Sequence, residues 1–193
     1  MKTDDIPSGK SKEEYLRSDA MRSMHLPSAQ PLRDLAMQLK EALSTEDKPA
    51  IKRICISMLT ELSAAYAVAQ PPFKLLNARP RKVRSDWVTE TFGDYDFDTM
   101  LIRLWMRTAV QKKPTSYGTF LSTLCHEFCH HLDVAAFGLP NTFHTRGFYE
   151  RAGALYHHVQ NTPVRPIIWT PLANGTFVVD WAKTMRAPMP AHR

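Results

Sequence analysis

Two histidines and a glutamate in the second half of the chain have the spacing of a catalytic zinc site. Residues 126–130 read His-Glu-Phe-Cys-His, a complete H-E-x-x-H pattern. On an α-helix, residues four positions apart lie on one face, so His126 and His130 would present two imidazoles to one metal ion. Glu127 directly follows the first histidine, which brings its carboxylate near a metal-bound water rather than the metal. The pattern predicts a zinc hydrolase with Glu127 as general base.

A catalytic zinc site needs a third protein ligand and keeps its fourth position open. Two residues downstream of the motif can supply that ligand, His144 and Glu150. His144 follows a Pro-Asn turn, where a second helix is expected to begin, and Glu150 lies within that helix. We favour His144, because Phe148 and Ala152 would dock this helix on the motif helix and direct His144 to the metal. Glu150 remains the alternative ligand.

Several other polar residues lie close to the motif in sequence. Asp133 is two helical turns beyond His126, so its carboxylate would either hydrogen-bond a ligand imidazole and fix its tautomer or face the solvent. His131 lies about 100° around the helix from His130 and is expected beside the site or on the surface, not as a ligand. Cys129 is rotated by a similar angle, and we expect a small core residue there.

The flanking sequence places the motif in the middle of a helix. Thr115 or Ser116 would cap its first turn, and no proline interrupts residues 117–137. Gly138 and Pro140 are expected to end it. Four apolar residues recur at intervals of three and four and predict the buried face: Leu121, Leu124, Phe128 and Leu132. A following helix is expected from about residue 144 to residue 160.

A β-hairpin is expected directly before the motif helix. The runs Trp87–Phe92 and Phe97–Arg107 are rich in β-formers, and the second alternates apolar with mixed residues. Gly93-Asp94 lies between the runs and predicts the turn that joins them.

These elements together resemble the SprT-like metallopeptidases, a minimal zincin group. The family pattern is a β-hairpin, a loop, a helix with H-E-x-x-H, and a third histidine followed by x-x-x-F on the next helix. In this chain these elements are residues 87–107, 112–117, 126–130 and His144-Thr-Arg-Gly-Phe148. The resemblance therefore covers about residues 80–160.

The resemblance implies a zincin-like α+β fold with Zn²⁺ bound by His126, His130 and His144 and with Glu127 as catalytic base. In zincins generally, the edge strand of the sheet binds an extended peptide as an added strand, which implies a protein or peptide substrate. The chain has no C-x-x-C pair and so lacks the accessory zinc ribbon of larger family members.

The rest of the chain is expected to complete a single domain over residues 29–181. Apolar residues at helical spacing predict a helix from Pro31 to Leu43 and a second from about Pro49 to Ala69, which would form a helical hairpin on the back of the sheet. Residues 176–181 would form a short strand.

The two ends of the chain are expected to lie outside this domain. Residues 1–28 are charged and polar and carry few large apolar side chains, which predicts a flexible N-terminal arm. Residues 182–193 are expected to form a frayed C-terminal tail.

Composition indicates a globular protein of the cytoplasm. The 193 residues are 44% hydrophobic and 23% charged, and no stretch has the length and apolarity of a membrane span or a signal peptide. Three cysteines, an odd number, do not form a disulfide framework, and this favours a reducing compartment.

Two other function classes remain alternatives. The net charge is +6, and Arg79, Arg81, Lys82 and Arg84 form a basic cluster that would either bind phosphate or lie solvated at a strand edge. No aromatic residues are interleaved with this cluster, so nucleic-acid binding is only weakly supported. A metal-dependent nuclease is therefore one alternative. The other is a binding protein with a structural zinc, which would need Cys129 or His131 as a fourth ligand.

Overall fold

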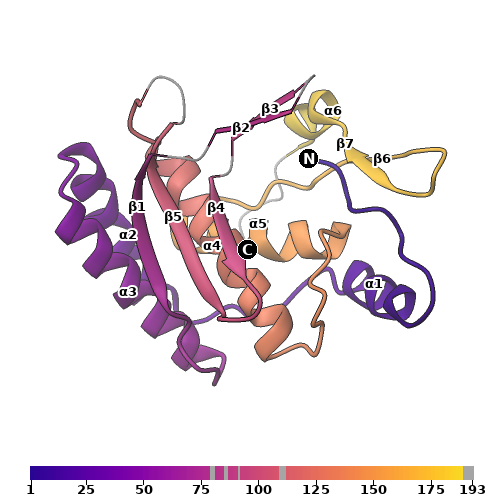
Figure 1. Ribbon diagram of the computed structural model, residues 1–193, viewed down its shortest axis with the longest axis horizontal. Coiled ribbons are helices and arrows are strands. Elements are labelled where there is room, and N and C mark those ends of the chain that lie inside the picture. The colour runs from indigo at the N-terminus through magenta and orange to yellow at the C-terminus, as the bar shows by residue number, and fades with distance from the viewer. Residues whose placement is uncertain (79–80, 85–86, 91, 109–111, 189–193) are drawn as a thin grey trace.

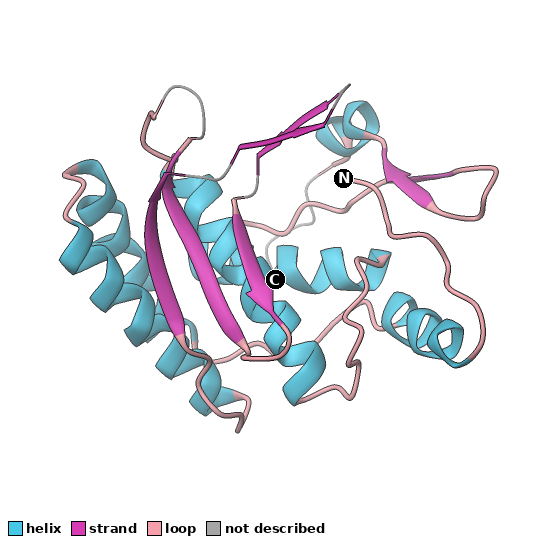
Figure 2. Cartoon of the chain, viewed as in Figure 1, coloured by secondary structure: helices cyan, strands magenta, loops and turns pink. Residues whose placement is uncertain are grey.

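A three-stranded sheet with helices packed against it forms the centre of the molecule (Figure 1). The computed structural model describes residues 1–78, 81–84, 87–90, 92–108 and 112–188. Figure 2 shows the same view with helices and strands in different colours. The α+β class expected from the sequence is confirmed.

The sheet has the strand order β1-β5-β4, with β1 at Phe73–Ala78, β5 at Leu101–Arg107 and β4 at Gly93–Asp96. Strand β5 is central, runs parallel to β1 and pairs antiparallel with β4. Its Ile102, Leu104 and Met106 are buried, as the alternation in the sequence predicts. Strand β4 is therefore an edge of this sheet, and it lies against helix α4.

The hairpin differs from the one predicted. Gly93 and Asp94 lie in β4, and the turn to β5 is formed by residues 97–100, where the Asp96 carboxylate accepts hydrogen bonds from the Thr99 backbone N–H (3.0 Å) and hydroxyl (2.8 Å). Glycine is needed at 93 for packing rather than for a turn. A Cβ there would lie 2.5 Å from Thr123 Cγ2 and 3.0 Å from Glu127 Cγ.

Two strands that precede β4 form a separate antiparallel pair. Strand β3, Trp87–Glu90, pairs antiparallel with β2, Arg81–Arg84, in a two-stranded sheet. Three members of the basic cluster thus lie in β2, and Arg79 lies outside the described residues.

The predicted pair of N-terminal helices is confirmed. Helix α2 spans Ala29–Ser44 and helix α3 spans Lys48–Ala65; they pack on each other, and α3 also packs on β1. The Asp47 carboxylate caps α3 by accepting a hydrogen bond from the Ala50 N–H (3.0 Å). Their buried residues include Leu32, Leu39, Ile51, Met58 and Leu62.

The motif helix and its successor also form as expected. Helix α4 spans Tyr117–Ala135 and is capped by Ser116, and the chain leaves it through Gly138 at φ +62°. Helix α5 spans Arg146–Gln160 and is capped by Thr145, whose hydroxyl accepts a hydrogen bond from the Phe148 N–H (3.0 Å). His144 therefore precedes the cap.

The N-terminal arm is not a detached segment, in contrast to the prediction for residues 1–28. It contains helix α1, Lys10–Ala20, which packs on α5 and buries Tyr15, Ser18 and Asp19. The prediction was wrong because it looked for large apolar residues, whereas α1 is held largely by buried polar groups.

The C-terminal part is also more ordered than predicted. Strands β6, Trp169–Pro171, and β7, Phe177–Val179, pair antiparallel, and the second lies within the predicted strand. Helix α6 spans Trp181–Arg186, so the start of the predicted tail is helical, and residues 189–193 lie outside the described part. Among the described residues, no helix combines the length and apolarity needed to cross a membrane.

Candidate metal centre

Three histidine side chains converge on one point beside α4. The Nε2 atom of His126 lies 3.1 Å from the Nε2 atoms of both His130 and His144. Ligand nitrogens of a tetrahedral zinc with bonds of 2.0–2.1 Å lie about 3.3 Å apart. The three nitrogens thus have the spacing of three corners of such a site. Among the described residues, these three histidines are the group of side chains that could hold a metal ion.

Burial keeps two of these imidazoles neutral, as metal ligands must be. Burial, and secondarily the charge of His144, lowers the pKa of His126 to about 3. Burial also lowers the pKa of His130 well below its ordinary value, and neighbouring histidines add to this effect. Neutral imidazoles retain a lone pair for a metal ion.

A threonine that the sequence did not reveal orients His130. Thr142 Oγ1 lies 2.6 Å from His130 Nδ1 and is buried. When Nδ1–H donates to this oxygen, Nε2 is unprotonated and faces the other two histidines. Thr142 has a φ of +37°, which is costly for a threonine, so the surrounding structure must hold this conformation.

Helix α5 supports the site as predicted through Phe148. Its ring stacks on the imidazole of His130 at 4.4 Å between centroids and meets His126 edge-on at 4.9 Å. Phe148 itself is fully buried. The apolar stripe of α5 therefore packs directly behind two of the three imidazoles.

The structure brings His144, not Glu150, to the motif histidines. The Glu150 carboxylate instead pairs with the Arg22 guanidinium and accepts a hydrogen bond from Trp169 Nε1 (3.1 Å). It is therefore engaged with the segment that follows α1 and with β6. His144 is held by Asp4, whose Oδ2 accepts a hydrogen bond from the His144 backbone N–H (2.8 Å) and lies 3.4 Å from Nδ1.

Glu127 is buried beside this centre, with 5% of its surface exposed. Burial, and secondarily the charge of Asp94, raises the pKa of Glu127 to about 8. A divalent cation held by the three histidines would favour the carboxylate and oppose this shift. Asp94 is itself bound in two hydrogen bonds by Arg103 across β4 and β5, at 2.7 and 2.9 Å.

Asp133 does not contact a ligand imidazole and is not exposed, so both expectations for it were wrong. Its carboxylate pairs with Arg151 of α5 at 2.6 Å, and neither side chain has exposed surface. The Arg151 guanidinium also donates to the carbonyls of Ser18 (3.2 Å) and Met21 (2.7 Å). This buried pair therefore joins α4, α5 and the end of α1.

His131 and Cys129 are not part of the histidine centre. His131 is buried, with its Nε2 2.8 Å from the Ala69 carbonyl and its Nδ1 3.2 Å from the Tyr95 hydroxyl. Cys129 is a free, buried thiol, as predicted for a core residue. Among the described side chains, neither supplies the fourth ligand that a closed structural zinc site would need.

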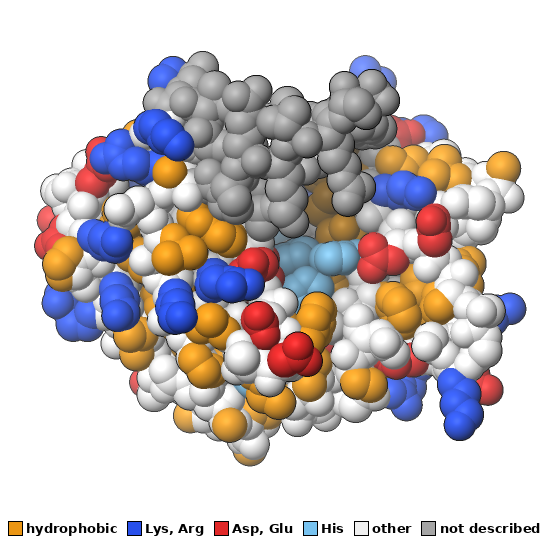
Figure 3. Space-filling model, in the orientation of Figure 1, with side chains coloured by type: hydrophobic (Ala, Val, Ile, Leu, Met, Phe, Trp, Pro, Cys, Tyr) orange, Lys and Arg blue, Asp and Glu red, His pale blue; other side chains and the backbone are white. Residues whose placement is uncertain are grey.

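Two cavities meet at the histidine centre. The first, about 570 Å³, is lined by Gly93 of the edge strand and by Thr123 and Glu127 of α4. The second, about 520 Å³, is largely apolar and lies between α5, the N-terminus and residues 164–184. Both share Ser122, His126 and Tyr156. Figure 3 shows histidine side chains in a hollow at the middle of one face, near acidic side chains.

Comparison of the chain with known protein families, curated proteins and solved structures finds no match. The zincin-like character expected for the fold is therefore not confirmed by any relative. Function has to be inferred from the geometry of the site.

Proposed function

We propose that the chain is a zinc-dependent peptidase of the SprT-like kind, with His126, His130 and His144 as metal ligands and Glu127 as general base. One observation carries this proposal: three imidazole nitrogens converge at metal-ligand spacing beside a buried glutamate that lines an accessible cavity.

The ligand set fits zinc. Three imidazoles without a thiolate are found in catalytic zinc sites, where a fourth position stays open. A zinc ion bound there would supply a Lewis acid and lower the pKa of water in its open position. The absence of a fourth protein ligand in the described part of the chain supports a catalytic rather than a structural site.

The position of Glu127 supports its proposed role as base. Glu127 lines the first cavity together with His126, so a substrate entering there would meet both residues. In amide hydrolysis, Glu127 would take the proton of the attacking water and pass it to the leaving amine. Its burial limits competition from bulk water for that proton.

The edge strand beside the first cavity supports an extended polypeptide as the substrate. Strand β4 is an edge strand of the sheet, and its Gly93 lines the first cavity next to the motif helix. A peptide added along such an edge gains backbone hydrogen bonds and would pass the histidine centre. The second, apolar cavity opens at His126 and would accept a substrate side chain.

The test begins with metal content. We expect elemental analysis of purified protein to find one zinc per chain in the wild type and none in His126→Ala or His144→Ala. A well-folded wild type without metal would contradict the proposal. Zinc retained in His144→Ala would restore Glu150 as the third ligand.

The reaction is tested with the isosteric variant Glu127→Gln. Zinc-loaded wild type is expected to cleave an unfolded protein, such as reduced and carboxymethylated lactalbumin, and the variant to lose about 10²–10⁴-fold in rate while keeping its zinc. Wild type from which a chelator has removed the zinc is the control for metal-dependent cleavage. Undiminished cleavage by Glu127→Gln would remove its role as base, and cleavage of RNA but not protein would favour the nuclease alternative.

A further inference from the structure

The third ligand is held by the first residues of the chain. Asp4 and His144 form two hydrogen bonds: the Asp4 N–H donates to the His144 carbonyl (3.0 Å), and the His144 N–H donates to Asp4 Oδ2 of the side chain (2.8 Å). The same carboxylate oxygen lies 3.4 Å from His144 Nδ1, on the side of the ring opposite the nitrogen that faces the metal site. One side chain thus contacts both the backbone and the imidazole of a ligand.

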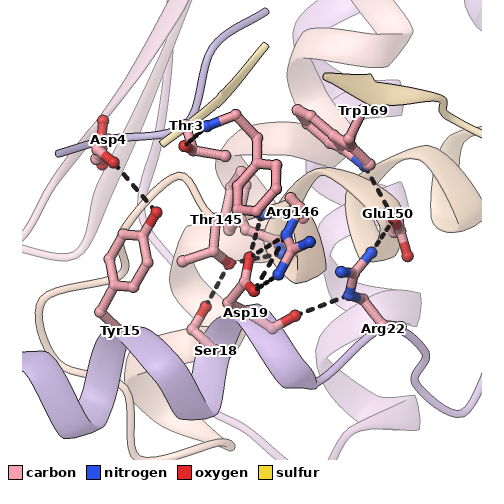
Figure 4. Close-up of polar contacts among 12 residues, drawn as sticks. Thr3, Asp4, Tyr15, Ser18, Asp19, Arg22, Thr145, Arg146, Glu150 and Trp169 are labelled. Carbon is pink, nitrogen blue, oxygen red and sulfur yellow. Dashed lines mark hydrogen bonds and ion pairs between the residues drawn. The ribbon is translucent and has the colours of Figure 1, made fainter. Parts of the chain in front are cut away.

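Asp4 is itself fixed on both sides. Thr3 exchanges hydrogen bonds with Phe177 of β7, its N–H donating to the Phe177 carbonyl (2.9 Å) and its hydroxyl accepting from the Phe177 N–H (3.0 Å). The Tyr15 hydroxyl of α1 donates to the Asp4 carbonyl (3.1 Å). Figure 4 shows Asp4 and Tyr15 on one side of this network. The position of Asp4 is therefore set by β7 and α1.

The end of α1 holds the chain immediately after His144 (Figure 4). Ser18 and Thr145 share a hydrogen bond between their hydroxyls (2.9 Å), and the Asp19 carboxylate pairs with the Arg146 guanidinium and accepts from the Arg146 N–H (3.0 Å). The two segments approach so closely that a Cβ at Gly147 would overlap the Ser18 carbonyl oxygen. The arm thus holds both the third ligand and the residues that directly follow it.

We propose that Asp4 is a positioning residue for His144, through which the docked N-terminal arm sets the affinity of the histidine centre for its metal. A ligand histidine commonly donates its second ring N–H to a carboxylate, which fixes the tautomer and the ring orientation. His130 has Thr142 for this purpose, and Asp4 is in position to serve His144. The inference rests on the metal centre of the proposed function, but not on peptide hydrolysis.

Metal affinity of the folded protein is the first readout. Metal-free wild type, Asp4→Ala, Asp4→Asn and Asp5→Ala are titrated with Zn²⁺ against a chromophoric chelator. Asp5 is the matched control, because it carries the same charge one residue away, yet its side chain is largely exposed and contacts Lys2 and Asn174 rather than a histidine. We expect a 10–100-fold weaker affinity for Asp4→Ala, a smaller loss for Asp4→Asn, and wild-type affinity for Asp5→Ala.

The second readout separates positioning from general loss of structure. Nitrogen NMR of the metal-free protein is expected to find His144 protonated at Nδ1 in the wild type and in Asp5→Ala, and in a mixture of tautomers in Asp4→Ala. Titrations are made well below the unfolding temperature of each metal-free variant, so that affinity refers to folded protein.

The outcomes distinguish this inference from the proposed activity. Equal zinc affinity in Asp4→Ala and Asp5→Ala would overturn the inference and leave the peptidase proposal standing. A second outcome is that zinc affinity falls in Asp4→Ala but not in Asp5→Ala, while the wild type binds zinc and cleaves no peptide. This outcome would support the inference and contradict the peptidase proposal. A wild type that binds no zinc would overturn both.

Discussion

The candidate metal centre combines one half built by a single helix with another half built by distant segments. His126 and His130 are four residues apart on α4, and the core of the protein holds that helix through Leu121, Leu124 and Phe128. His144 lies in the loop before α5 and is held by Asp4, 140 residues away in sequence. Local spacing thus places two of the candidate ligands, whereas contacts with the N-terminal arm hold the third.

The two halves also differ in the physics that holds them. Burial of apolar side chains stabilises the α4 half, and this burial does not require a specific polar partner for each residue. The arm is attached largely by hydrogen bonds and ion pairs, each of which replaces a bond to water and contributes only about 1 kcal/mol net. The third ligand should therefore respond to single polar substitutions and to pH more than the first two do.

The largest effect is expected from removing ligands in each half. Loss of a residue that only supports a ligand typically weakens metal affinity about 10–100-fold. His130→Ala and His144→Ala should each weaken zinc affinity by more than this, because this type of site needs at least three protein ligands. Glu150→Ala should bind zinc like the wild type, since its carboxylate pairs with Arg22. Isothermal titration with Zn²⁺ measures this, and a large loss in Glu150→Ala would contradict the assignment.

A smaller effect is expected where the arm joins α5. Burial acts to raise the pKa of Asp19, but hydrogen bonds from Arg146 and its charge lower it below the ordinary value. Because the folded pKa is depressed, the stabilisation is present above the unfolded pKa of about 3.9 and is lost as the pH falls through the folded pKa. Asp19→Asn should cost about 2 kcal/mol at pH 7.

Urea unfolding at a series of pH values tests whether the stabilisation by Asp19 is lost as the pH falls. The difference in unfolding free energy between wild type and Asp19→Asn should shrink as the pH falls below about 4. A difference that stays constant down to pH 2 would show that the charge of Asp19 does not hold the arm. Asp5→Asn serves as the control at an exposed site of equal charge.

The smallest effect is expected from Thr142→Val. The substitution keeps the shape of the side chain but removes the oxygen that lies 2.6 Å from His130 Nδ1. We expect zinc affinity to fall about tenfold, at the low end for supporting residues, because Phe148 still holds the ring in place. A drop as large as that of Asp4→Ala would mean that both halves depend equally on their supporting hydrogen bonds.

The elements predicted correctly depend on local patterns. The caps of α4 and the apolar spacing of α2, α3 and α4 act over one or two helical turns, and the structure has these helices close to the expected bounds. The hairpin was placed wrongly because Gly93 has two possible uses. A turn and a close approach to α4 both favour glycine, and only the packed neighbours Thr123 and Leu104 distinguish them.

The sequence by itself determined the relation of His126, Glu127 and His130, because helix geometry places residues four apart on one face whatever the rest of the chain does. Only the tertiary structure decided for His144 over Glu150, paired Asp133 with Arg151, and brought Thr142 and Asp4 to the ligand histidines. These contacts join segments 12 to 140 residues apart. Their partners are chosen by which loops the packed core brings together, and no local spacing encodes that choice.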